Sequence, residues 1–86
     1  MRTVVESKRF ATEAKALAED FRRLDEILRG LTFVIAKNPA CGWPTVDDRI
    51  WGIASQQWID KSFILYYSFT ATHVYLEALL VADEQD

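Results

Sequence analysis

Cysteine, histidine and glycine are scarce in this sequence, and their scarcity excludes several kinds of site. Cys41 is the only cysteine, so no disulfide forms within one chain and no cysteine-based metal cluster can be built. His73 is the only histidine, and its separation from Cys41 by 32 residues favours neither a Cys–His nucleophile pair nor a metal site. The glycines at positions 30, 42 and 52 are too dispersed for a phosphate-binding loop. We therefore expect no metal and no cofactor.

Long apolar runs and a secretory leader are also missing. The segment "MRTVVESKRF" carries charges every few residues and has no apolar stretch of the kind that a signal peptide requires. No run approaches the roughly 18 apolar residues that cross a bilayer. At 86 residues, with half of them apolar, the chain predicts a single domain over residues 1–86 that is soluble, cytoplasmic and independent of membranes.

Positive charge is scarce in the second half of the chain. Residues 1–37 hold eight basic and six acidic side chains, a balance of +2. Residues 38–86 hold only Arg49 and Lys61 against seven acidic side chains, a balance of −5. A polyanion would be repelled by that half, so direct nucleic-acid binding is not expected there.

The clearest positive signal is an apolar stripe at helical spacing in the first half. Its steps alternate between four and three residues, as on one face of a helix. The stripe consists of Phe10, Ala14, Leu17, Phe21, Leu24, Leu28 and Leu31. One long helix is an alternative, but we favour a short helix and a longer one, broken near Glu19 and Asp20, with Asp20 as a cap. The stripe is expected to pack on a sheet; the alternative is that part of it forms a homodimer seam.

Strand-like runs lie on either side of this helical segment. "TVVESKRF" predicts a short first strand, and "NPACGWP" ends the helices because Pro39, Gly42 and Pro44 oppose their continuation. Residues 49–58, 62–69 and 73–82 then predict three strands, the last two as an antiparallel hairpin, although 73–82 is also a plausible helix. The expected fold class is α+β: two helices on a small, mostly antiparallel four-stranded sheet, in the order β-α-α-β-β-β.

Aromatic side chains are dense in the second half. Alternation places Phe63, Leu65, Tyr67 and Phe69 on one face of a strand, where they fill the core beneath the helices. Other aromatics are candidates for a platform that binds a partner, and a protein suits it better than stacked bases because no basic groove accompanies it. These partner-binding candidates are Trp43, Trp51, Trp58 and Tyr66.

The chain resembles the RelE/ParE superfamily of toxin–antitoxin toxins, which includes plasmid stabilisation proteins. The resemblance is carried by "FATEAKALAEDFRRLDEILRGL", the following "NP", and then "RIWGI", "FILYYSF" and "VYLEALLV". It covers nearly the whole chain. It implies a compact toxin domain that a cognate antitoxin protein wraps and neutralises, and whose target is the ribosome or, in the ParE-like mode, DNA gyrase.

The same resemblance implies that residues for RNA cleavage are missing. In the branch that cleaves mRNA on the ribosome, the strand matching "SFILYY" usually reads Tyr-Arg-hydrophobic-hydrophobic-Tyr. Here the arginine position holds Phe63, while the final tyrosine remains as Tyr66. Trp51 and Ile53 stand where that branch often has lysine or arginine, and the chain ends "VADEQD" in place of a basic tail.

Three functions follow as expectations. The first is a toxin-family component that acts mainly through protein binding. The second is a ribosome-dependent endoribonuclease with an atypical site, and its candidate catalytic residues are Arg49, Lys61, Tyr66 and His73. The third is a non-toxic structural or dimeric interaction module on the same fold, because a fold does not fix a function.

Overall fold

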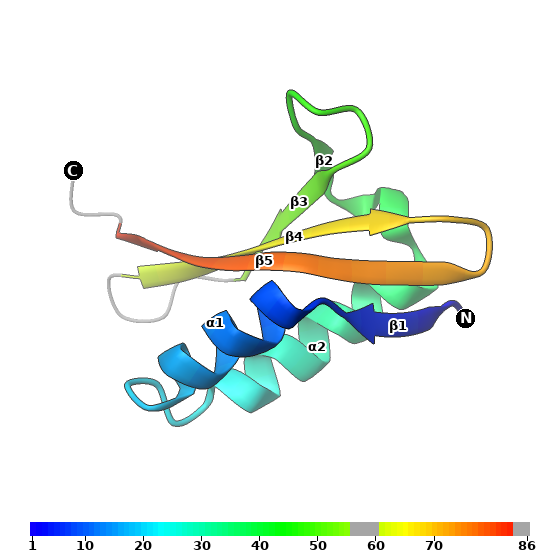
Figure 1. Cartoon of the computed structure of the whole chain (residues 1–86). Coiled ribbons are helices and arrows are strands. Elements are labelled where there is room, and N and C mark those ends of the chain that lie inside the picture. Colours follow the sequence, from blue (N-terminus) through cyan, green and yellow to red (C-terminus); the bar gives the residue numbers. More distant parts are fainter. Residues whose placement is uncertain (56–60, 84–86) are drawn as a thin grey trace.

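Two helices cover one face of a twisted sheet in the computed structural model, which describes residues 1–55 and 61–83 (Figure 1). The α+β class expected from the sequence is confirmed. In chain order the elements are β1 (Thr3–Glu6), α1 (Lys8–Ala18), α2 (Leu24–Lys37), the short 3₁₀ helix η1 (Pro39–Cys41), β2 (Trp43–Pro44), β3 (Trp51–Ala54), β4 (Lys61–Phe69) and β5 (His73–Asp83).

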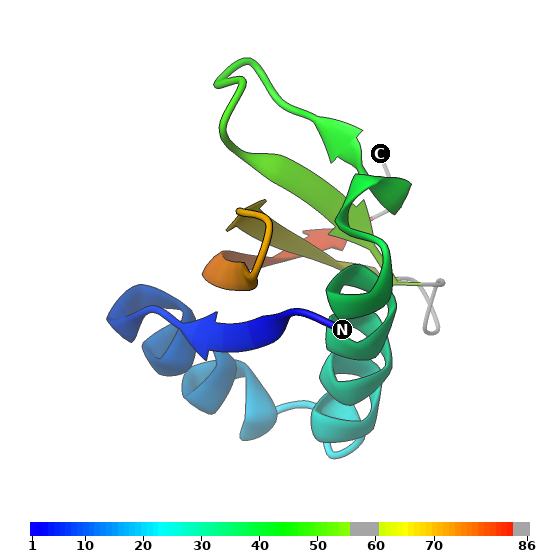
Figure 2. The ribbon, with the colours of Figure 1, turned by 90° about the vertical axis from the view of Figure 1, so that its right-hand side faces the viewer.

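The sheet has five strands in the described part of the chain, in the order β1-β5-β4-β3-β2. The prediction of four strands in the order β-α-α-β-β-β was therefore wrong, because β2 lies within the segment that we expected to be a loop. Strand β1 pairs in parallel with β5, and the remaining pairs are antiparallel. Figure 2 shows β1 at one edge, and β2 and β3 at the other.

Strand β2 forms because two glycines allow a close approach of the chain. A Cβ atom at Gly42 would lie 2.2 Å from the carbonyl oxygen of Gly52, and one at Gly52 would lie 2.9 Å from the indole ring of Trp43. Because Gly42 and Gly52 have no side chains, the two segments come close enough for Trp43 to pair with Gly52 and Pro44 with Trp51. This pairing extends the sheet by one short edge strand, which ends at a proline.

The helical segment is broken, as the sequence predicted, but its caps differ from the prediction. Ser7 caps α1: its hydroxyl oxygen accepts a hydrogen bond from the backbone N–H of Phe10 at 3.0 Å. Helix α1 ends at Ala18, and α2 begins at Leu24 after Arg23, so Asp20 is not the cap. Helix α2 continues past Gly30 and ends at Lys37, as expected.

Strands β4 and β5 form the predicted antiparallel hairpin, and their alternation fills the core. Phe63, Leu65 and Tyr67 are fully buried on the helix-covered face, whereas Phe69 is only partly buried. The prediction that this side of β4 forms the core is thus confirmed. Burial of such side chains is the main favourable contribution to folding.

A β-bulge interrupts the hairpin and alters its other face. Tyr66 pairs with Ala78 and Tyr67 pairs with Leu76, so Glu77 has no partner residue on β4. The face that the helices do not cover is called the open face below. It carries Tyr66 and Ser68 of β4, whose side chains alternate with those of the buried residues.

Ser7 and helix α1 supply hydrogen-bond partners to the part of β5 that extends past the end of β1. The Ser7 hydroxyl donates to the carbonyl of Glu77 at 3.1 Å, and the buried Leu79 N–H donates to the Glu13 carboxylate at 3.0 Å. These contacts replace hydrogen bonds that a longer β1 would supply. Among the residues described, no helix is both long and apolar enough to span a bilayer.

Candidate functional site

Two adjoining hollows form a groove on the open face, here called the open-face groove. The first has a volume of about 480 Å³ and lies between the β2–β3 loop and the turn that joins β4 to β5. The second has a volume of about 410 Å³ and extends toward the start of α1. Ile50 and Glu77 line both hollows, so the two hollows are neighbours on this face. The β2–β3 loop extends away from the helices (Figure 1) and forms one wall.

Two of the predicted partner-binding aromatics lie together beside this groove. Trp43, Gly52 and Tyr66 are cross-strand partners in one row, so they share the open face. The indole of Trp43 occupies the space above Gly52 and is 43% exposed. Tyr66 is half-buried and lines the second hollow. The row therefore forms an aromatic surface on this face that contains two of the four predicted residues, Trp43 and Tyr66.

The other two predicted aromatics do not join this row. Trp51 pairs with Tyr67, so it lies on the helix-covered side of the sheet, and its ring packs edge-on against Phe69 at 5.6 Å. Trp51 is half-buried against the core, and its remaining exposed part lines the first hollow of the groove. Trp58 lies outside the described residues.

Three of the four catalytic candidates lie on the open side of the sheet. Arg49 in the β2–β3 loop is 87% exposed, and its Nε lies 3.8 Å from a carboxylate oxygen of Asp47. Tyr66 lines the second hollow, and the ring of His73 stacks on Tyr75, with 5.9 Å between the ring centroids. Lys61 opens β4, but its side chain lies outside the description. Thus only one cationic candidate borders the first hollow.

The first hollow is acidic. Asp47, Asp48 and Glu77 line it against the single guanidinium of Arg49, which leaves a balance of −2. Both aspartates are exposed, whereas Glu77 is half-buried and accepts a hydrogen bond from the Ser68 hydroxyl at 2.7 Å. A phosphate group would be repelled by this arrangement.

Phe63, which stands where the resemblance implies arginine, is part of the core. Its side chain is fully buried, and its ring packs edge-on against Phe21 with centroids 5.1 Å apart. It faces the helices, away from the open-face groove. An arginine here would place an uncompensated charge in the core, so the position does not serve a phosphate site in this chain.

Tyr67 has the one strongly shifted pKa that the structure shows in its described part. Burial raises the pKa of this phenol to about 12, and its hydroxyl donates to the carbonyl of Pro39 at 2.5 Å. The nearby Cys41 thiol also raises the pKa, and a hydrogen bond with Gly42 lowers it. This hydrogen bond links η1 to β4, so the role of the Tyr67 hydroxyl is structural.

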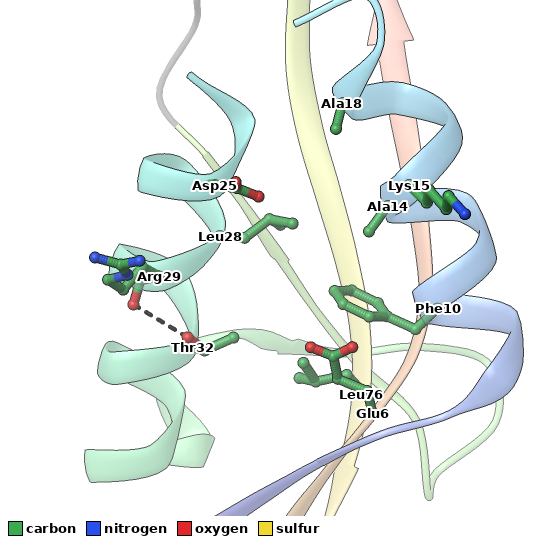
Figure 3. Close-up of a pocket in the computed structure, with 10 residues that line it drawn as sticks. All are labelled: Glu6, Phe10, Ala14, Lys15, Ala18, Asp25, Leu28, Arg29, Thr32 and Leu76. Atoms are coloured by element: carbon green, nitrogen blue, oxygen red, sulfur yellow. Dashed lines mark hydrogen bonds between the residues drawn. The ribbon is translucent and has the colours of Figure 1, made fainter. Parts of the chain in front are cut away.

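A second groove, shown in Figure 3, separates the two helices and has a volume of about 410 Å³. Phe10 of α1 and Leu28 of α2 point toward each other across it, whereas Lys15 and Arg29 point away. Its acidic and basic lining residues balance, and nothing in its chemistry selects a ligand.

Among residues 1–55 and 61–83, no three His, Cys, Asp or Glu side chains are grouped as a metal site requires. Cys41 is an exposed free thiol in η1, and no hydrogen bond links it to His73 within these residues.

No protein-family model, curated protein or solved structure matches the chain. The open-face groove is the feature on which a functional proposal can be based, because it combines exposed aromatic side chains with unevenly distributed charge.

Sequence reasoning missed several residues of this groove. The residues predicted to form a site do not include Ile50, Ser68, Tyr75 or Glu77. One signal was available: Glu77 is the only charge within the apolar run "HVYLEALLVA". A lone charge in such a strand can indicate a bulge or a functional site. The position of Glu77 beside Ser68, however, depends on the pairing of β4 with β5.

Proposed function

We propose that this domain is the toxin-type component of a toxin–antitoxin module and acts by binding proteins. The observation that carries the proposal is the open face, which the helices leave uncovered and which presents Trp43, Tyr66, Tyr75 and Leu80 around a groove. Exposed aromatic and apolar side chains beside a hollow are typical of protein interfaces. A cognate antitoxin is the expected first partner.

The element order supports the RelE/ParE type of module. Strand β1 and the two helices precede β3, β4 and β5, with the short strand β2 as an addition between them, and β4 and β5 form a hairpin at the centre of the sheet. The helices occupy one face, so a partner has the opposite face and the sheet edges available (Figure 2). The similarity lies in the order of the elements along the chain, and membership of the RelE/ParE superfamily is part of what we propose.

The charge of the groove favours protein binding over RNA cleavage. Cleavage by attack of the 2′-hydroxyl requires a base, an acid and positive charge on the phosphorane. The first hollow has three carboxylates and one guanidinium, and that guanidinium already neighbours Asp47. A ParE-like mode, in which the domain binds and poisons DNA gyrase, needs none of these catalytic groups.

The endoribonuclease function remains a second candidate because of one observation. Arg49, Tyr66 and His73 all lie on the open side of the sheet, which the helices leave uncovered. If this function holds, purified protein with ribosomes cleaves a translated message, and Arg49→Ala abolishes the cleavage. An intact message under these conditions rules the function out.

Expression of the chain alone in bacterial cells tests the proposal. We expect growth to stop, and the product of a neighbouring antitoxin-like open reading frame to restore growth when it is co-expressed. Incorporation of labelled amino acids distinguishes the targets. A rapid fall indicates translation, whereas continued incorporation with arrested growth directs the search to DNA topology.

The matched variant for this experiment is Tyr66→Ala, with Val46→Ala as its control. Tyr66 lines the groove, whereas Val46 is fully exposed in the β2–β3 loop and lines neither hollow of the groove. We expect Tyr66→Ala to reduce growth arrest or antitoxin binding, and the control to retain both. Normal growth and normal incorporation with the wild-type chain would contradict the proposal and favour a structural interaction module.

A further inference from the structure

Glu77 lines the open-face groove together with Arg9 and Arg49, but within the described part of the chain these two arginines pair with Glu13 and Asp47 and neither forms an ion pair with Glu77. The Ser68 hydroxyl donates to one carboxylate oxygen of Glu77 at 2.7 Å and so fixes the orientation of the group. The ion pairs of the described residues involve other acids, and none of them reaches Glu77. A half-buried carboxylate that has only a neutral partner gains most from a cationic ligand.

An aromatic ring lies in the same hollow as this carboxylate. Tyr75 is 36% exposed, and His73 stacks on it with the two rings 12° from parallel. An arginine side chain suits such a place, because its planar fork matches a carboxylate and its face stacks on an aromatic ring. Lysine offers a compact charge with neither property.

The opposite wall reinforces this preference. Asp47 and Asp48 in the β2–β3 loop leave the first hollow with its balance of −2. The second hollow continues from Glu77 along the side chains of Ile50, Tyr66 and Leu80. Arg9 also lines this hollow, and its guanidinium pairs with Glu13. An occupant therefore meets an excess of carboxylates in the first hollow and mainly apolar side chains in the second.

We propose that the open-face groove binds a segment of the partner protein that bears an arginine next to an apolar side chain. The guanidinium pairs with Glu77 and stacks on Tyr75, and the apolar side chain lies against Ile50, Tyr66 and Leu80. This inference rests on the proposed function only in taking the partner to be a protein. It adds that the recognised segment is basic, which complements the net negative charge of residues 38–86.

Peptide titrations monitored by amide chemical shifts of the isotope-labelled full chain test this inference. The probe is an acetylated peptide amide, Leu-Ser-Arg-Ser-Leu-Ser-Arg, in which leucine and arginine share one side of an extended chain. Matched probes replace both arginines by lysine or by glutamate. We expect the arginine probe to bind, the lysine probe to bind more weakly, and the glutamate probe not to bind.

The shifts should lie at Ile50, Ser68 and Glu77 and at their neighbours. Glu77→Gln keeps the size of the side chain and an oxygen for the Ser68 hydroxyl, yet removes the charge. We expect this variant to bind the arginine probe at least about fivefold more weakly. Asp25→Asn, which removes an exposed carboxylate on α2, should bind it unchanged.

Three results would overturn the inference. The first is shifts scattered over all the acidic residues, and the second is equal binding of the glutamate probe. The third is a dimer of the free chain, detected by sedimentation, whose dissociation by salt exposes the same residues; the occupant would then be a second copy. None of these results bears on growth arrest or its neutralisation, so the proposed function is judged separately.

Discussion

Tyr67 shows how one side chain joins distant parts of this molecule. Its ring fills the core from β4, while its hydroxyl reaches the carbonyl of Pro39 in η1. It therefore fixes the segment that leads from α2 into β2. Leaving a buried carbonyl without a donor costs more free energy than an average hydrogen bond contributes to stability.

Tyr67→Phe should lower the free energy of unfolding by about 1–2 kcal/mol, because the Pro39 carbonyl loses its buried donor while the ring is retained. Urea denaturation followed by circular dichroism measures the change. Tyr66→Phe is the control, since the hydroxyl of Tyr66 makes no hydrogen bond within the described residues, and its effect should stay within about 0.5 kcal/mol. Equal effects of the two variants would show that the Pro39 contact contributes nothing.

Alkaline pH should destabilise the protein through the same phenol. The pKa of Tyr67 is about 12 in the folded chain, against 10.0 without burial. Between these values the unfolded chain releases a proton that the folded chain retains, so stability is full below pH 10 and falls toward pH 12, by about 2 kcal/mol. Phenolate absorbance should show one of the three tyrosines ionising last, together with unfolding. Tyr67→Phe should lose this late transition.

Two glycines should respond to alanine in opposite directions. Gly30 is exposed in α2, and a Cβ there meets no atom within 4 Å, so Gly30→Ala should stabilise the helix by about 1 kcal/mol. Gly52→Ala must displace the ring of Trp43 and should destabilise the fold by about 1–3 kcal/mol. Thermal melts of the two variants measure both effects. A lower melting temperature for Gly30→Ala would indicate that α2 is strained at this position.

At the scale of elements, the contact between α1 and β5 depends on Glu13. Its carboxylate accepts the N–H of Leu79, whose side chain is buried, and pairs at its other oxygen with Arg9 at 3.4 Å. Strand β1 is too short to cover this part of β5. The helix therefore completes the hydrogen bonding of the strand as well as covering its face.

Glu13→Ala should cost about 1.5–3 kcal/mol, because a hydrogen bond to a charged acceptor is lost. Glu13→Gln retains an oxygen acceptor and should cost less. Arg9→Ala removes only an exposed ion pair and should change stability by less than about 1 kcal/mol. Hydrogen exchange at the Leu79 amide provides the direct measurement. It should quicken in Glu13→Ala and remain slow in Arg9→Ala, and the opposite order would contradict this account.

At the scale of the whole molecule, one core connects the helices to the central strands. The buried cluster includes Phe10 of α1, Leu24 of α2, Phe63 of β4 and Leu76 of β5. The other residues of the helical stripe pack against this same cluster. The chain should therefore unfold as a single unit.

Coincident transitions would confirm this cooperativity. Circular dichroism reports mainly on the helices, whereas tryptophan fluorescence of a Trp58→Phe variant reports on the edge where Trp43 and Trp51 lie. We expect the two signals to give the same midpoint and slope in urea. An earlier fluorescence transition would mean that β2 and β3 open independently of the core.

Local periodicity is sufficient to predict the helices and the central strands. The spacing of Phe10, Ala14 and Leu17 specifies a helix, and the alternation through Phe63, Leu65 and Tyr67 specifies a strand with one buried face. The hairpin followed from the short turn between two such strands. These features depend on neighbours in the chain, so they can be read without the fold.

The long-range pairings and the groove arise from tertiary packing. The parallel pairing of β1 with β5, the strand β2 and the placement of Trp51 on the helix side depend on residues far apart in sequence. The bulge that directs Glu77 toward Ser68 arises from the register of two strands. Register is set by the sum of packing over both faces of a sheet, and local propensity does not contain that sum.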